Sequence, residues 1–273
     1  MASGNQATFF VSTGRCGTQW LQSALAAAYP DAAVVTHEPV REPYEPKVYL
    51  RAYDKLDELL SSDTVSSHLA GIRDTLQSKA YIETGWPSYP ALPLFIDRLD
   101  GRARIVHLVR HPVYVAMSLA THAIYDRQDW IARAAISPFD AGTVQKDLAG
   151  AWAGMDMYEK CLFWWTEINL YGLELRQRRP DVAFALVRYE DLFNPNTPVL
   201  EKLVAFMGLA WNPALRALSS KVVDQYQLKS SAYDWKRVLA YPRTVALAKQ
   251  FGYAFENMAT PYLSARYFGE SKT

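Results

Sequence analysis

The sequence predicts an α/β fold in three layers, with a central parallel sheet of about five strands and helices on both faces. Short apolar runs alternate with helical patterns along the chain, which is typical of βα units around a parallel sheet. The 273 residues contain no Pro/Gly/Ser linker and no repeat, so we expect one domain over residues 1–273. A polar or charged cluster follows each of the first four expected strands, at the sheet edge where ligands usually bind.

The apolar runs and the helical patterns define the elements in chain order. Strands are expected at five short runs, Thr8–Ser12, Ala33–Thr36, Ala80–Glu83, Ile105–Val109 and Val182–Val187. Helices are expected between them, at Thr18–Ala28, Thr64–Gln77, Val113–His122 and Gln145–Arg178. A glycine costs helix stability, so the last helix is open to a break near Gly154 or Gly172.

Composition restricts the classes of partner and the compartment. Hydrophobic residues make up 50% of the chain and the formal net charge is +1, which gives no support to a nucleic-acid partner. The two cysteines imply no disulfide framework, and no apolar run is long enough to span a bilayer. Because the start MASGNQ is unlike a signal peptide, we expect a cytoplasmic protein without a membrane span.

The loop after the first strand predicts a phosphate site. Gly14-Arg15-Cys16-Gly17-Thr18 leads directly into a helical pattern, and loop N–H groups together with an open first helical turn bind anions. In a Walker A loop the second glycine comes two positions later than Gly17 does here, and the lysine directly follows that glycine. Here the cation, Arg15, lies inside a shorter loop, so a magnesium-bound triphosphate is not the expected ligand. Cys16 is interpreted as a small filler residue, not as a nucleophile.

Two further segments end strands with groups that suit a nucleotide. Arg110 leaves the fourth strand, and Ser118 follows about two turns along a proline-started helix, so both can reach one phosphate. The alternative is a surface arginine and an ordinary helix serine. No aspartate ends this strand to hold magnesium, which favours a metal-free site. The fifth strand runs into Tyr189, which would lie at the same rim as Gly14.

Together, STGRCGTQWL, VRHPVYVAMSL and the Tyr189-Glu190-Asp191 turn resemble the sulfotransferase family that uses 3'-phosphoadenosine 5'-phosphosulfate (PAPS). The resemblance implies a P-loop NTPase-like fold, PAPS as donor and 3'-phosphoadenosine 5'-phosphate (PAP) as product, and no metal. It implies that the first loop, from Gly14 through Gln19, holds the 5'-phosphosulfate, with Arg15 stabilising the leaving oxygen. Arg110 and Ser118 would hold the 3'-phosphate.

The same resemblance assigns the adenine contacts and one further anchor. Tyr189 and Trp20 would border the adenine, although Trp20 could equally be a core aromatic on an amphipathic helix. A basic loop near the C-terminus would add a contact to the 3'-phosphate, and the candidates here are Lys236 and Arg237. The alternative for this pair is a solvated turn beside Trp235, because the glycine that the family pattern has there is absent.

Catalysis needs a base for the proton of the acceptor. Cytosolic members have a histidine after the third strand, where this chain has Glu83-Thr84-Gly85. Another branch, with carbohydrate and tyrosylprotein sulfotransferases, has a glutamate after the second strand, where Glu38 fits with a shift of one residue. We therefore rank Glu38 first, His37 second and Glu83 third. Neighbours on a continuing strand point opposite ways, so His37 and Glu38 would not both face the sulfuryl group. Alternatively, Glu38 only pairs with a nearby arginine.

The acceptor is expected to be a hydroxyl or amine of a small molecule, carbohydrate or lipid-like compound, in contact with Glu83 and an aromatic wall. Candidate wall residues are Tyr44, Trp86 and Trp130, which could equally pack the core beneath long loops. His107 lies within a strand and is interpreted as a core imidazole. The oligomeric state is not indicated. A kinase using ATP and magnesium and a non-catalytic nucleotide-binding scaffold are the alternative functions.

Overall fold

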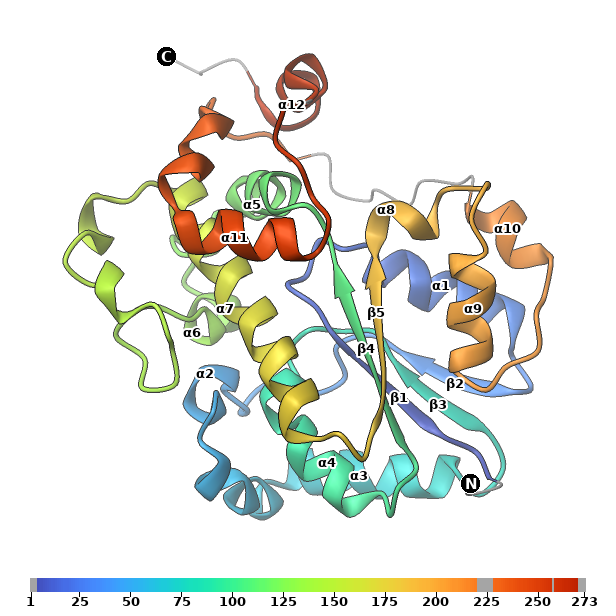
Figure 1. Cartoon of the computed structure of the whole chain (residues 1–273). Coiled ribbons are helices and arrows are strands. Elements are labelled where there is room, and N and C mark those ends of the chain that lie inside the picture. The colour runs from blue at the N-terminus through green and yellow to red at the C-terminus, as the bar shows by residue number, and fades with distance from the viewer. Residues whose placement is uncertain (1–3, 220–227, 257, 270–273) are drawn as a thin grey trace.

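A five-stranded parallel sheet forms the centre of the computed structural model, which describes residues 4–219, 228–256 and 258–269 (Figure 1). The strand order is β2-β3-β1-β4-β5, and every neighbouring pair is parallel. The strands are β1 (Ala7–Val11), β2 (Ala33–Thr36), β3 (Ala80–Glu83), β4 (Ala103–Val109) and β5 (Ala183–Arg188). The predicted strands are thus confirmed to within two residues at each end, and their carboxyl ends meet at one edge.

Helices cover both faces of the sheet, as two residues of β4 illustrate. Arg104 and His107 are three positions apart and so point to opposite faces. Arg104 donates to the carbonyl of Phe206 in α9 (Val199–Phe206), whereas His107 Nε2 lies 2.9 Å from Asn169 Oδ1 of α7 (Met157–Arg178). His107 is fully buried and burial lowers its pKa to about 4, so it is the core imidazole expected from the sequence.

Three of the helices before α7 closely match those predicted from the sequence pattern. They are α1 (Thr18–Ala28), α3 (Asp63–Thr75) and α5 (Pro112–Thr121). The predicted helix from Gln145 was wrong in its first part, because α7 begins at Met157 after two 3-10 turns, Lys146–Leu148 and Trp152–Gly154. Asp156 starts α7 by forming a reciprocal capping box with Glu159. The helix is unbroken at Gly172, where any Cβ would lie 2.6 Å from the His107 ring.

The remaining elements connect these units. They are α2 (Pro46–Tyr49), α4 (Leu92–Arg98), α6 (Trp130–Ala134), α8 (Tyr189–Leu192), α10 (Ala214–Ser219), α11 (Pro242–Gln250), α12 (Thr260–Tyr267) and the 3-10 segments Tyr53–Ser61, Tyr89–Ala91 and Trp235–Ala240. In Figure 1, α12 lies above α5, which it contacts, and α11 lies just below α5, beside the arrowhead of β4 and in contact with α7. The C-terminal part of the chain therefore lies near the edge where ligands collect. None of the described helices is long and apolar enough to cross a bilayer.

Candidate active site

A cavity of about 590 Å³ lies at the carboxyl edge of the sheet, and residues after all five strands line it. The strand order arranges these residues in a row. His37 follows β2, Trp86 follows β3, the Gly14–Thr18 loop follows β1, Arg110 follows β4 and Tyr189 follows β5. The row has a histidine at one end, the predicted phosphate loop in the middle and an aromatic ring at the other end.

The loop between β1 and α1 has a backbone that only a few residue types adopt easily. Gly14, Arg15 and Gly17 have φ of 71°, 56° and 77°, in the left-handed region. Gly17 is required twice, because an added Cβ would also lie 2.8 Å from the ring of Tyr189. Gly17 is the N-cap of α1 and offers no side-chain cap, and no acidic residue lies in the first turn. The positive end of α1 is therefore available to an anion.

Two arginines and a serine meet beside this loop. Arg15 Nε donates to Ser118 Oγ at 2.8 Å, and Arg110 donates to the Arg15 carbonyl at 2.7 Å. The Arg110 guanidinium lies over the Tyr189 ring, 4.3 Å from its centroid. Its Nε is buried and has no hydrogen-bond partner among the described protein atoms. A buried charged donor without a partner is costly, so this nitrogen suits an anionic ligand.

Three aromatic rings border the cavity on the β5 side. Trp20, on α1, packs edge-on against Phe193 with centroids 4.9 Å apart, and Tyr189 lies 4.8 Å from the same ring. All three line the cavity. Phe193 was not predicted as a site residue, although it lies two positions after the Tyr189-Glu190-Asp191 turn. The cluster offers apolar ring faces and edges next to the arginines, against which a planar base can pack.

His37 and Glu38 both line the cavity, contrary to the expectation for a continuing strand. β2 ends at Thr36, and Glu38 has φ of 52°, so the two side chains do not alternate. Glu38 Oε2 accepts from Arg41 at 2.7 Å, and its Oε1 lies 3.6 Å from His37 Nε2. Glu38 therefore forms the ion pair with an arginine that was the alternative interpretation of this residue, and the His37 imidazole beside it faces the same cavity.

Hydrogen bonding determines the tautomer of His37. Thr84 Oγ1 donates its single proton to the Thr36 carbonyl at 3.3 Å, so it accepts from His37 Nδ1 at 3.2 Å. Nε2 then carries the lone pair. Burial lowers the pKa of His37 below its ordinary value, and the nearby Glu38 carboxylate opposes this shift only in part. His37 is therefore neutral at pH 7 and can accept a proton at Nε2.

Glu83 and two of the predicted wall residues lie outside the cavity lining. Glu83 is 1% exposed and is bonded to His68 Nε2 at 2.9 Å, Tyr81 at 3.0 Å and Ser88. These three partners hold the carboxylate in the core, so the structure gives no support to Glu83 as a base or acceptor contact.

Tyr44 and Trp130 pack in the core beneath the loops, which was the alternative interpretation of these residues. Trp130 Nε1 donates to the Tyr44 carbonyl at 2.8 Å, and neither side chain is more than 7% exposed. Trp86 is the predicted wall residue that lines the cavity, with Trp130 behind it at 5.9 Å between ring centroids.

Lys236 and Arg237 are not brought to the cavity. Arg237 pairs with Asp156 and with Glu159 at 3.4 Å, and Lys236 lines a separate pocket. Arg266 of α12 lines the cavity instead. Arg266 was not predicted as a site residue, because the local sequence shows only a basic residue between Tyr262 and Tyr267. Its position depends on how α12 packs against α5, which is long-range information.

Cys16 is a filler inside the loop, as interpreted from the sequence. It is fully buried, and its thiol donates to the Gly14 carbonyl at 3.2 Å. Burial raises the pKa of the thiol to about 11, so the nucleophilic thiolate is scarce at neutral pH. Gly14, Thr18 and Gln19 line the cavity directly. Among the described residues, no three His, Cys, Asp or Glu side chains are grouped to hold a metal ion.

Comparison with known proteins identifies the family. The family model of the sulfotransferase domain matches residues 5–237. Among solved structures, the sulfotransferase domain of the Synechococcus PCC 7002 olefin synthase is 17% identical, with a TM-score of 0.53 over 93% of this chain and 97% of that one. The sulfotransferase domain of the curacin biosynthetic pathway is 14% identical, with a TM-score of 0.53 over 93% and 100%.

A sulfotransferase from Alicyclobacillus acidocaldarius is 16% identical, with a TM-score of 0.50 over 93% of this chain and 98% of that one. At these identities the likeness concerns the fold alone. A search of curated proteins gave no match. The family model, however, covers most of the chain, including the phosphate loop, Arg110 and Tyr189. The chain therefore belongs to the sulfotransferase domain family and is an enzyme of sulfuryl transfer.

Proposed function

We propose that this enzyme transfers the sulfuryl group of PAPS in line to a hydroxyl, or an amine, of an acceptor and releases PAP. The observation that carries the proposal is that one cavity is lined by the Arg15 loop, the Arg110–Ser118 pair and the His37–Glu38 pair. Anion binding and proton removal therefore border one space. Sulfuryl transfer needs both functions on opposite sides of the sulfur.

The described residues fit PAPS in charge and shape. The loop N–H groups and the first turn of α1 would hold the 5'-phosphosulfate, and Arg110 with Ser118 would hold the 3'-phosphate. Arg110 has a buried Nε without a protein partner, which supports this assignment. Trp20, Phe193 and Tyr189 would contact the adenine. When bound, PAPS supplies a sulfuryl group attached to a phosphate leaving group.

Arg15 would stabilise the negative charge that develops on the bridging oxygen as the bond to sulfur breaks. Its guanidinium stays charged at all relevant pH values and donates through several N–H groups. Its Nε is bonded to Ser118, the residue proposed for the 3'-phosphate, so the terminal guanidinium nitrogens would contact the bridging oxygen. This preorganisation supports an electrostatic role, because the charge need not reorient during the reaction.

We propose His37 as the base and Glu38 as its support, which reverses the order given by the sequence alone. Glu38 is held by Arg41 at 2.7 Å, and an arginine partner makes a carboxylate a weaker base. His37 has its proton on Nδ1, so Nε2 can take the proton of the acceptor hydroxyl. Glu38 Oε1, at 3.6 Å from Nε2, would then stabilise the imidazolium.

Thermal unfolding with PAP, without metal, and with ATP plus magnesium tests the nucleotide half of the proposal. We expect PAP to raise the Tm and Arg110→Ala to abolish this increase. The matched control Arg243→Ala removes an exposed arginine that pairs with Asp147 outside the cavity, and it should retain the full increase. Stabilisation by ATP and magnesium alone would instead indicate the kinase alternative.

Transfer of labelled sulfate tests the catalytic half. Arg15→Ala is expected to lower kcat by about 10²–10³, the usual cost of removing one group that stabilises developing charge. If the native protein binds PAP but transfers sulfate to no acceptor and not to water, the scaffold alternative replaces the enzymatic proposal for this chain.

A further inference from the structure

The cavity has an apolar wall formed by residues in and after α5 and by residues in and after α6. Leu119 and Ile124 follow Ser118 along and beyond α5, Ile131 lies within α6, and Ala135 directly follows that helix. Leu119, Ile124 and Ala135 are only 6%, 4% and 5% exposed, although they line the cavity. The little surface that they expose therefore faces a partly enclosed space, which suits an apolar group.

The packing of Trp86 joins this wall to the proposed base. Trp86 lies 5.9 Å from Trp130, the residue before Ile131, between ring centroids. The residue before Trp86 in the chain is Gly85, where an added Cβ would lie 2.4 Å from the backbone nitrogen of Glu38. Trp86 thus lies between Trp130, the residue before the wall residue Ile131, and the backbone of Glu38.

The wall is fixed to the stretch that follows Glu38. Trp130 Nε1 donates to the Tyr44 carbonyl at 2.8 Å, and Arg133 Nε lies 3.6 Å from Glu45 Oε1. Arg133 also forms an ion pair with Glu42. Two stretches that are far apart in the sequence, 39–53 and 123–150, therefore hold one another.

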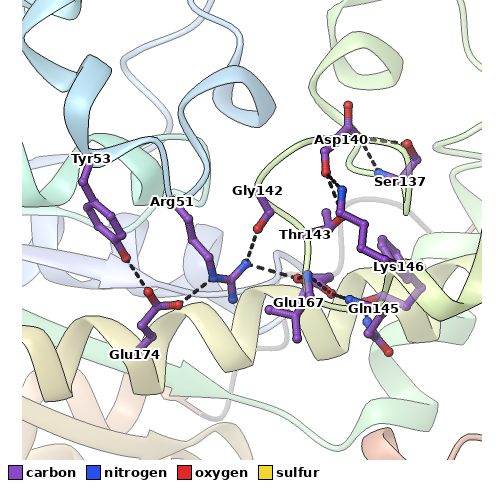
Figure 2. A network of polar contacts seen from close by, with 12 residues as sticks. Arg51, Tyr53, Ser137, Asp140, Gly142, Thr143, Gln145, Lys146, Glu167 and Glu174 are labelled. Carbon is purple, nitrogen blue, oxygen red and sulfur yellow. Dashed lines mark hydrogen bonds and ion pairs between the residues drawn. The ribbon is translucent and has the colours of Figure 1, made fainter.

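A polar network fixes the same two stretches to α7 (Figure 2). Arg51 donates to the Gly142 carbonyl at 2.7 Å, to Glu167 at 3.2 Å and to Glu174 at 2.6 Å. Glu167 is fully buried and also accepts the backbone N–H of Gln145 at 2.7 Å. Because α7 packs on the sheet, the acceptor end of the cavity is preformed, which favours a ligand complementary to this shape.

The charges at this end are already paired. Among the described lining residues, Glu38 is the only carboxylate, and Arg41 occupies it. Arg127 at the rim is bonded to Asp129 at 2.9 Å. A cationic acceptor would thus lose its hydration without gaining a carboxylate, which is unfavourable in a partly enclosed site. The hydroxyls of a sugar would likewise lose water against the side chains of Leu119, Ile124, Ile131 and Ala135, which have no hydrogen-bonding group.

We propose that the acceptor is an uncharged alcohol with a hydrocarbon body. The body lies against Leu119, Ile124, Ile131, Ala135 and Trp86, and the hydroxyl is presented to His37 Nε2. This inference rests on the proposed sulfuryl transfer and names its acceptor class. It selects one of the acceptor kinds that the sequence left open and excludes free sugars and amines with a positive charge.

A matched panel of acceptors tests this class: butan-1-ol, hexan-1-ol, octan-1-ol, 8-aminooctan-1-ol and glucose, with labelled PAPS. We expect kcat/KM to rise about fourfold for each added methylene from butan-1-ol to octan-1-ol, the gain typical of a buried CH₂. For 8-aminooctan-1-ol it should fall at least tenfold below octan-1-ol, and glucose should remain at the background. A higher value for glucose or for the amino alcohol would overturn the inference.

A charge reversal on the wall provides the second test. Ile131→Asp should lower kcat/KM for octan-1-ol at least tenfold and narrow the preference over 8-aminooctan-1-ol, because the new carboxylate pairs with the ammonium. The control Leu239→Asp makes the same change at a residue that is 53% exposed and outside the cavity lining, and should alter neither value. An unchanged preference in Ile131→Asp, with PAP binding intact, would contradict the inference.

Binding measurements separate failure of this inference from failure of the proposed function. If PAP does not raise the Tm, the nucleotide assignment fails and the acceptor inference fails with it. If PAP binds, the acceptors are titrated into the PAP complex by calorimetry, which needs no turnover. Tighter binding of octan-1-ol than of butan-1-ol, 8-aminooctan-1-ol or glucose supports the inference even if transfer is slow. Equal or reversed affinities overturn it while leaving the nucleotide assignment in place.

Discussion

The buried His107 makes the stability of the fold depend on pH in a way that can be calculated. Burial lowers its pKa to about 4, whereas an unfolded histidine has a pKa of about 6.5. The unfolded state therefore binds more protons than the folded state between these values, and the free energy of unfolding falls as the pH falls from about 6.5 toward 4. Because pH 5 lies about 1.5 below the pKa of the unfolded histidine and still above that of the folded one, the free energy of unfolding is about 2 kcal/mol lower at pH 5 than at pH 7.

His107→Gln tests this value, because glutamine retains an amide that can reach Asn169 and does not titrate. Urea unfolding of both proteins at pH 7, 6 and 5 gives the two slopes. We expect the native protein to lose about 2 kcal/mol more than the variant between pH 7 and pH 5. Other titrating groups, including His37 and His111, contribute equally to both proteins and cancel in the comparison. Parallel pH dependences of the two proteins would refute the reasoning.

Three further predictions concern the base, the loop and the network. His37→Gln should lower kcat by about 10²–10⁴, as for loss of a general base. It should also remove the acidic limb of the kcat/KM profile, which we expect for the native enzyme below the ordinary histidine pKa of about 6.5, because burial lowers the pKa of His37 and protonation abolishes the base; an unchanged acidic limb would exclude this role. Gly17→Ala should weaken PAP binding about tenfold or more in calorimetry. Gly101→Ala, which has a similar φ of 74° but nothing within 4 Å of its Cβ, should not, and equal affinities would contradict the packing argument. Arg51→Met should lower the free energy of unfolding by about 3 kcal/mol, because it leaves a buried carboxylate unpaired. Arg178→Met, an exposed control, should cost less than about 1 kcal/mol in the same urea titration, and similar losses in both would disprove the buried-charge account.

The parts of the site that could be predicted from the sequence are those whose determinants are local. The loop from Gly14 to Thr18 is specified by its own glycines and by the helix that follows directly. Arg110 and Ser118 are on one strand–helix unit, and Pro112 starts the helix between them. Parallel strands bring these units to one edge, so the meeting of the loop, Arg110 and Ser118 follows from the strand pattern.

The parts that could not be predicted depend on contacts between distant segments. Arg266 reaches the cavity because α12 packs against α5, and Lys236 lies elsewhere, although both are equally basic in the sequence. The start of α7 is a different case, because the capping box of Asp156 and Glu159 that marks it is a local signal, which the helical periodicity extending back to Gln145 obscures. The roles of His37 and Glu38 depend on a backbone turn that local sequence does not specify.

The close approach of Gly85 to Glu38 supports the proposal of a base after β2. In the resemblance to the cytosolic branch, Gly85 occupies the place of the catalytic histidine after the third strand. Here an added Cβ would lie 2.4 Å from the Glu38 nitrogen and 2.7 Å from its Cα, so the backbone of the β2 exit fills the space that a side chain at position 85 would need. A base after β3 and the observed turn after β2 therefore exclude each other.

This exclusion can be tested with Gly85→Ala. The new methyl group meets backbone, which cannot move aside as a flexible side chain could, so Glu38 and the neighbouring His37 must shift. We expect kcat to fall at least tenfold, while PAP affinity measured by calorimetry stays within twofold, because the nucleotide contacts lie on the other side of the loop. Gly71→Ala, which has nothing within 4 Å of its Cβ, serves as the control. If Gly85→Ala weakens PAP binding and kcat alike, the β3 exit supports the whole cavity. A selective loss of kcat instead supports a division of the sheet edge, with proton transfer on β2 and β3 and nucleotide binding on β1, β4 and β5.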